Sequence, residues 1–83
     1  MIGQREKIWA ILRAEDRWLG ALDILRLAHS LRDEKINHIN IEPIRRCLQE
    51  LLARNMVKKD DRNPDLPLWL ARPPGKFFFI ILN

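Results

Sequence analysis

The chain of 83 residues has few cysteines, glycines and serines, and each shortage excludes a class of site. A single cysteine, Cys47, excludes an internal disulfide and favours a reducing compartment. Three glycines are too few and too scattered to form a glycine-rich phosphate loop. The one serine, Ser30, has no nucleophile motif around it. We therefore expect a protein that is not an enzyme and needs no cofactor.

Long apolar segments are also missing from the sequence. The longest apolar run, Phe77–Leu82, is far shorter than the roughly 20 residues that a membrane-spanning helix needs. The N-terminal residues lack the apolar centre of a signal peptide. We expect a cytoplasmic protein with no membrane contact.

Metal ligands are equally scarce. His29 falls on the apolar side of a predicted helix, and His38 falls in a predicted loop. Neither has a cysteine or carboxylate at a convincing ligand spacing. Cys47 falls on a predicted buried face, where an inert packed thiol is the expected state. The sequence predicts no metal site and no small-molecule ligand.

What the chain does have is basic charge, and this charge is unevenly distributed. The net charge is +4, from 15 basic and 11 acidic side chains. Residues 1–41 hold seven basic and six acidic side chains, whereas residues 42–83 hold eight and five. A basic excess in the second half favours a polyanionic partner, although many basic proteins bind no nucleic acid.

Apolar residues at spacings of three and four predict three helices, over residues 4–14, 21–31 and 40–55. The third pattern is the clearest, with Asn40 as a helix cap and Asn55 as a stop. Its predicted buried face consists of Ile44, Cys47, Leu48, Leu51 and Leu52.

Short β-prone segments surround these helices. Residues 17–20 predict a brief strand, and residues 56–60 and 68–71 predict a β-hairpin around a turn-rich loop. In this hairpin, Trp69 is expected to pack against the third helix. The apolar tail, residues 76–83, is expected to form a further strand or a dimer contact.

The stretches LGALDILRLAHSL and INIEPIRRCLQELLARNMVKKDDRNPDLPLWLA together resemble the winged helix-turn-helix family of bacterial and phage DNA-binding proteins. The similarity covers about residues 5–72. It implies an α+β fold of three helices and a hairpin wing over residues 1–75, followed by the tail at 76–83. It further implies a small transcriptional regulator that acts as a homodimer and whose partner is double-stranded DNA. In this family the last helix before the hairpin enters the major groove, and the wing touches the DNA backbone.

The residue types on the third helix suit this role. Arg pairs well with the guanine edge and Gln with the adenine edge in the major groove. The candidate base-reading residues are Arg45, Arg46, Gln49 and Glu42. The alternative is a solvated charged face, in which the acidic residues are helix partners of the arginines.

The hairpin supplies candidate contacts to the DNA backbone, namely Lys58, Lys59, Arg62 and Arg72. The alternative role for the lysines is to protect an edge strand from unwanted pairing. Three carboxylates, those of Asp60, Asp61 and Asp65, lie among these cations and weaken the case for a wing tip pressed against DNA. A second function therefore stays open, that of a winged-helix module that binds another protein and has no affinity for DNA.

Overall fold

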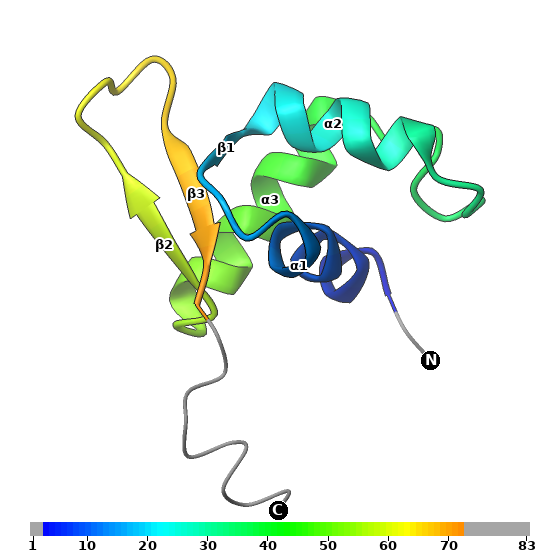
Figure 1. The fold of residues 1–83 in the computed structure, drawn as a ribbon, viewed down its shortest axis with the longest axis horizontal. Coiled ribbons are helices and arrows are strands. Elements are labelled where there is room, and N and C mark those ends of the chain that lie inside the picture. The colour runs from blue at the N-terminus through cyan, green and yellow to red at the C-terminus, as the bar shows by residue number, and fades with distance from the viewer. Residues whose placement is uncertain (1–2, 73–83) are drawn as a thin grey trace, which may run out of the picture.

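The computed structural model describes residues 3–72, which form three helices and a small antiparallel sheet (Figure 1). The predicted tail at residues 76–83 and the domain boundary at residue 75 lie outside the described residues. The arrangement confirms the predicted α+β class and is consistent with a winged helix layout. The elements are α1 Gln4–Glu15, β1 Leu19–Gly20, α2 Ala21–Ser30, α3 Ile41–Ala53, β2 Val57–Asp60 and β3 Leu68–Ala71.

The helices begin and end close to the predicted residues, for local reasons. The backbone N–H of Gly20 donates to Asp23 Oδ2 at 3.1 Å, which fixes the first turn of α2. Asn40 is extended at the N-cap of α3, but its side chain makes no capping hydrogen bond. Asn55 has a φ of 65°, a left-handed conformation that stops the helix and turns the chain into β2.

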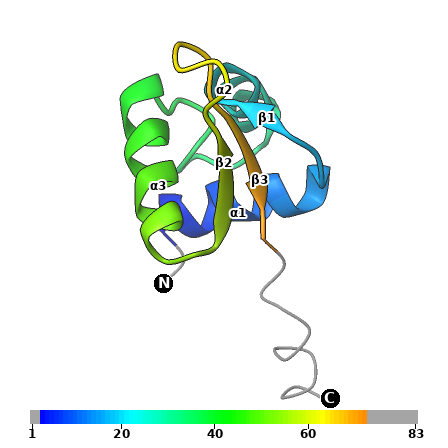
Figure 2. The ribbon, with the colours of Figure 1, turned by 90° about the vertical axis from the view of Figure 1, so that its left-hand side faces the viewer.

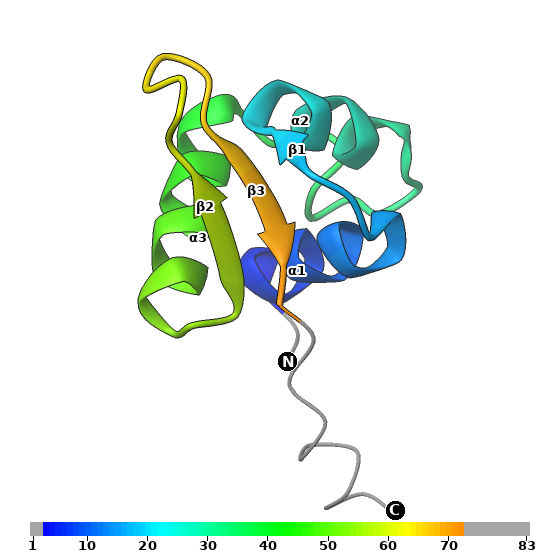
Figure 3. The same cartoon turned by 60° about the vertical axis from the view of Figure 1, so that its left-hand side comes forward.

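The sheet has the order β1-β3-β2, so β3 lies between the other two strands (Figure 3). Trp69 of β3 is paired with Leu19 on one side and with Lys59 on the other. We call residues 57–71 the wing, residues 61–67 its tip, and the end near Val57 and Ala71 its base. The sequence predicts the brief first strand but not this pairing, which makes a hairpin into a three-stranded sheet.

The core lies between the three helices and one face of the sheet. In Figure 2, α3 runs beside β2 while α1 crosses behind the strands. The predicted apolar face of α3 is buried, with Leu52 half-buried at its edge. Trp69 is also buried, with 3% of its surface exposed. The largest fully buried side chains are Ile8, Leu12, Leu19, Ile24, Ile36, Ile44, Leu48, Leu51 and Val57.

The connection between α2 and α3 is anchored by two buried isoleucines. Ile36 and Ile39, the two apolar residues of an otherwise polar segment, are 1% and 5% exposed. His29 Nε2 lies 2.7 Å from the carbonyl oxygen of Ile39, and Lys7 Nζ of α1 donates to the carboxylate of Asp33. These contacts hold the loop between the two helices against α1 and α2.

None of the helices in the described part of the chain combines the length and the apolar composition needed to cross a membrane.

Candidate nucleic-acid interface

The outer face of α3 presents all four predicted base-reading side chains to solvent, but not in one direction. Arg45 and Gln49 are four residues apart and therefore lie on one side of the helix. Arg46 is rotated by roughly 100° from Arg45. Glu50, one turn after Arg46, forms a 3.5 Å ion pair with Arg5, so Arg46 lies on the side of α3 nearer to α1.

Arg45 is already engaged within its own helix. Its Nη1 donates to Glu42 Oε1 at 2.8 Å, and both side chains are largely exposed. An exposed pair of this kind contributes only about 0.2–1 kcal/mol to stability. A phosphate or a guanine edge can therefore replace Glu42 as the acceptor at modest cost.

The helix α3, the N-terminal half of α2 and the wing enclose a groove of about 410 Å³, which we call the wing groove. Arg45 and Gln49 line it from α3, and Lys59 and Trp69 line it from the wing. The remaining lining residues are Gly20, Ala21, Leu22, Asp23, Arg26, Asp65, Leu66, Pro67 and Leu68.

Arg26 is a candidate site residue that sequence reasoning missed. It lies on α2, one turn after Leu22. Its guanidinium is the third cationic group that lines the groove, after those of Arg45 and Lys59. The available signal was its position on the polar side of an otherwise apolar helix. Arg26 makes no ion pair with any residue in the range 3–72.

Three leucines of the wing groove are exposed. Leu22 is 53% exposed, Leu66 is 65% exposed and Leu68 is 36% exposed. Exposed apolar side chains gathered around one groove indicate a surface that another molecule covers. The apolar sequence of α2 predicts a helix packed between neighbours. In the structure Ile24 and Ala28 are buried, whereas Leu22 faces the groove.

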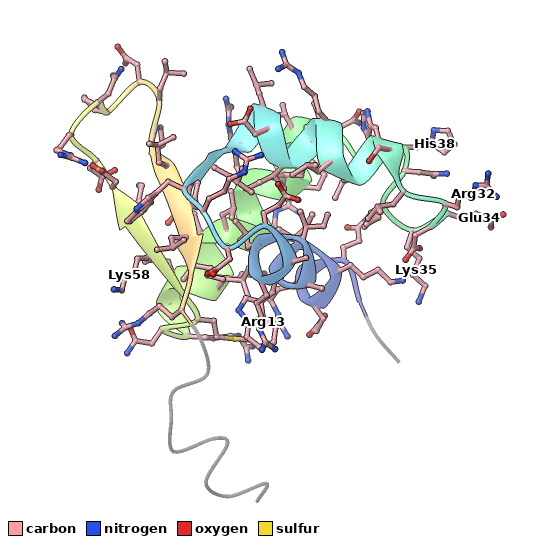
Figure 4. The ribbon with its side chains drawn as sticks, viewed as in Figure 1. Arg13, Arg32, Glu34, Lys35, His38 and Lys58 are labelled. Atoms are coloured by element: carbon pink, nitrogen blue, oxygen red, sulfur yellow. The ribbon has the colours of Figure 1, made fainter. Side chains whose placement is uncertain are left out.

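The two wing lysines point to opposite faces of the sheet. Lys59 is paired with the buried Trp69, and its Nζ lies 5.2 Å from the centre of the indole ring, on the face that packs on the helices. Lys58 is paired with Leu70 and projects from the other face, away from α3 (Figure 4). Successive residues of a strand always alternate in this way. The two lysines therefore cannot contact one stretch of backbone as a pair.

The cations at the wing tip are neutralised by its carboxylates. Arg62 forms a hydrogen-bonded ion pair with Asp60, with Nη2 and Oδ2 2.6 Å apart. Hydrogen bonds from Arg62 lower the pKa of the Asp60 carboxyl from its ordinary value of 3.8, and the same pair raises the pKa of Arg62. Lys59 Nζ lies 3.3 Å from Asp61 Oδ1.

Arg72 lies at the wing base, far along the strand from the tip. Its Nη1 donates to Asn55 Oδ1 at 2.6 Å, and its backbone N–H donates to the carbonyl of Met56 at 2.9 Å. The four predicted backbone-contact residues are thus divided between two ends of the wing and two faces of its sheet.

The residues considered for metal or thiol chemistry lie apart. Within residues 3–72, no three histidine, cysteine or acidic side chains are grouped as a metal site would require. Cys47 is buried, and this burial raises the pKa of its thiol from 9.0. A buried thiol with a raised pKa is a poor nucleophile at neutral pH.

No family model matches this chain, and neither does any curated protein or solved structure.

Proposed function

We propose that the protein binds double-stranded DNA, with the outer face of α3 in the major groove and the wing beside the sugar-phosphate backbone. The observation that carries this proposal is the shared position of Arg45 and Gln49 on one exposed side of α3. An α-helix fits the major groove, and bidentate Arg and Gln side chains suit guanine and adenine edges there. Arg26, which forms no ion pair within residues 3–72, adds positive charge to the same groove.

The proposed role is that of a regulator of the bacterial or phage kind, which works by binding and not by catalysis. Two copies would place two α3 helices about one helical turn apart on a pseudo-palindromic site. The buried free thiol of Cys47 supports a reducing compartment such as the cytoplasm.

The test begins with selection of bound duplexes from a randomised library at about 50 mM salt, followed by fluorescence anisotropy on the enriched site. The variant R45A/Q49A should lose most discrimination between this site and one with changed bases, because each bidentate pair contributes about 1–3 kcal/mol of discrimination. R32Q, on the loop between α2 and α3, removes the same single positive charge and is the control for the lowered net charge (Figure 4). Absence of binding to every duplex in the library would refute the proposal.

A second candidate function is the binding of a protein, and the exposed leucines of the wing groove favour it. Leu22 and Leu66 suit an apolar partner surface better than a hydrated phosphate chain. The variant L22S/L66S separates the two functions, since it removes apolar surface without changing charge. DNA binding predicts near-normal duplex affinity for L22S/L66S and weak affinity for R45A/Q49A.

A further inference from the structure

The wing tip is a poor surface for phosphate. Carboxylates of the tip and of the adjoining end of β2 hold the nearby cations, in the pairs Asp60–Arg62 and Asp61–Lys59. A further carboxylate, that of Asp65, is exposed at the tip. Residues 59–65 therefore hold two basic and three acidic side chains. A phosphate approaching the tip meets net negative charge, which opposes its binding.

The wing base has the opposite character. The carbonyl oxygen of Met56 accepts two hydrogen bonds, from the backbone N–H of Arg72 at 2.9 Å and from the indole Nε1 of Trp9 at 3.2 Å. The guanidinium of Arg13 lies 4.8 Å from the centre of the Trp9 ring. These contacts bring Arg13 of α1 and Arg72, which follows β3, to the neighbourhood of Met56, although the two arginines are distant in sequence.

Two more cations lie within two residues of Met56 along the chain. Arg54 is the C-cap of α3 and directly precedes Asn55, whose side chain accepts the hydrogen bond from Arg72. Lys58 is exposed on β2, two residues after Met56. Figure 4 shows Lys58 projecting from the side of the wing and Arg13 beneath α1. We call Arg13, Arg54, Lys58 and Arg72 the wing-base cluster.

The cluster is not neutralised by the part of the chain that the structure describes. None of its four members forms an ion pair with a carboxylate of residues 3–72, a property they share with Arg26, Arg32 and Arg46, whereas Arg5, Lys7, Arg17, Arg45, Lys59 and Arg62 each form one. Arg13, Arg54 and Lys58 are also exposed to solvent. Exposed cations without acidic partners are the groups that bind phosphate oxygens most readily.

We infer that the wing-base cluster is a phosphate-binding surface that holds the nucleic-acid backbone, and that the wing tip takes no part in this contact. The part of this inference that concerns duplex DNA as the source of the phosphates rests on the proposed function. Arg54 lies about 13.5 Å beyond Arg45 along the axis of α3. The major groove is about 12 Å wide. Arg54 also lies about half a turn round α3 from Arg45, so it faces phosphates beside the groove and not the bases that Arg45 reads.

The test compares the salt dependence of duplex binding between variants. The slope of log affinity against log salt falls by about 0.9 for every phosphate-binding cation that is removed, so R54Q/K58Q should lower it by about two. R32Q/K35Q removes the same charge from the far loop and should leave the slope nearly unchanged. R62Q, at the wing tip, should also leave it unchanged. Circular dichroism establishes that each variant is folded.

A second measurement uses the wild-type protein and needs no variant. Tripolyphosphate and a duplex are titrated separately while the backbone amide and arginine side-chain signals are followed by NMR. The inference expects both ligands to shift signals at residues 13, 54–58 and 72, and not at residues 60–66. Binding of tripolyphosphate at the base without any duplex binding would support the phosphate surface and refute the proposed function.

The opposite results would overturn the inference and leave the proposed function intact. These are duplex binding with an unchanged salt slope in R54Q/K58Q, or duplex-induced shifts confined to the wing tip. If neither ligand shifts any signal at the wing base, the surface does not bind phosphate.

Discussion

The ammonium nitrogen of Lys59 lies 5.2 Å from the centre of the Trp69 indole ring, and the two residues are directly paired across β2 and β3. The pair closes the wing side of the wing groove, where a cation lies over the ring of a buried aromatic side chain. A lysine facing the helices is therefore part of the packing as well as of the surface charge.

Replacing Lys59 by Met tests this contact, because Met keeps the length of the side chain and removes its charge. We expect K59M to lower the free energy of unfolding by about 0.5–1 kcal/mol, the usual contribution of a cation above an aromatic ring near the surface. Urea denaturation measures the change. The control K58M lies on the opposite face and should change stability by less than about 0.5 kcal/mol. Equal losses in both variants would contradict the assigned contact.

Replacing Trp9 by Phe tests the link between α1 and the wing base. Phe keeps an aromatic ring but removes the indole N–H that donates to the carbonyl of Met56 at 3.2 Å. This carbonyl still accepts a hydrogen bond from Arg72, so the expected decrease in stability is about 0.5–1.5 kcal/mol. Thermal and urea unfolding measure it. The control W18F changes a tryptophan that is 41% exposed and should have little effect.

Replacing Glu42 by Gln tests whether the ion pair with Arg45 competes with DNA. The Glu42–Arg45 pair contributes about 0.2–1 kcal/mol, and E42Q removes both this competitor and a negative charge from the proposed interface. We expect duplex affinity to rise by up to about fivefold, measured by anisotropy at fixed salt. E34Q, on the loop between α2 and α3, gives the same charge change elsewhere. A loss of sequence preference in E42Q would instead assign base reading to Glu42 itself.

The pH dependence of stability tests the contact between Lys7 and Asp33. The hydrogen bond from Lys7 lowers the pKa of the Asp33 carboxyl from 3.8. A lowered pKa in the folded state stabilises the protein above pH 3.8, and this stabilisation disappears as the pH falls through the folded-state value. D33N should therefore be less stable than the wild type at about pH 7, and the difference should shrink at about pH 2. Urea midpoints at both pH values measure it, with E34Q as the control. A difference that stays constant would show that the contact is independent of charge.

The sequence predicts the helices and the hairpin well because these depend on local periodicity. Ile44, Leu48 and Leu51 share one face of α3 at any packing arrangement, so their burial follows from spacing alone. The anchoring of the loop by Ile36 and Ile39 follows similarly, since they are the apolar residues of a polar segment.

The sheet and the exposure of its neighbours could not be predicted in this way. Two residues, Leu19 and Gly20, carry too little pattern to indicate their partner strand, which only the packing of α1 and α2 brings into place. Leu22 is an apolar residue of a helix, yet it is exposed, because its side chain faces the groove between α2 and the wing. The position of the wing relative to α2 is a tertiary feature that the sequence pattern does not encode.

Part of the candidate site could be predicted from local backbone geometry, in addition to the residue types. The alternation of side chains along a strand already separates Lys58 from Lys59. The close spacing of Asp60 and Arg62 indicates a local pair at the turn. The wing-base cluster was not accessible from sequence, because Arg13 and Arg72 are linked only indirectly, through the contacts of Trp9 and Met56.

The position of β3 has a consequence for synthesis on the ribosome. It is the last of the described strands in the sequence, yet it is the middle strand of the sheet. A nascent chain that has released only residues 1–67 holds β1 and β2 with nothing between them, and their mutual pairing is not a native contact. Native sheet formation therefore requires that Ala71 has left the exit tunnel, because β1 and β2 join the sheet only through β3.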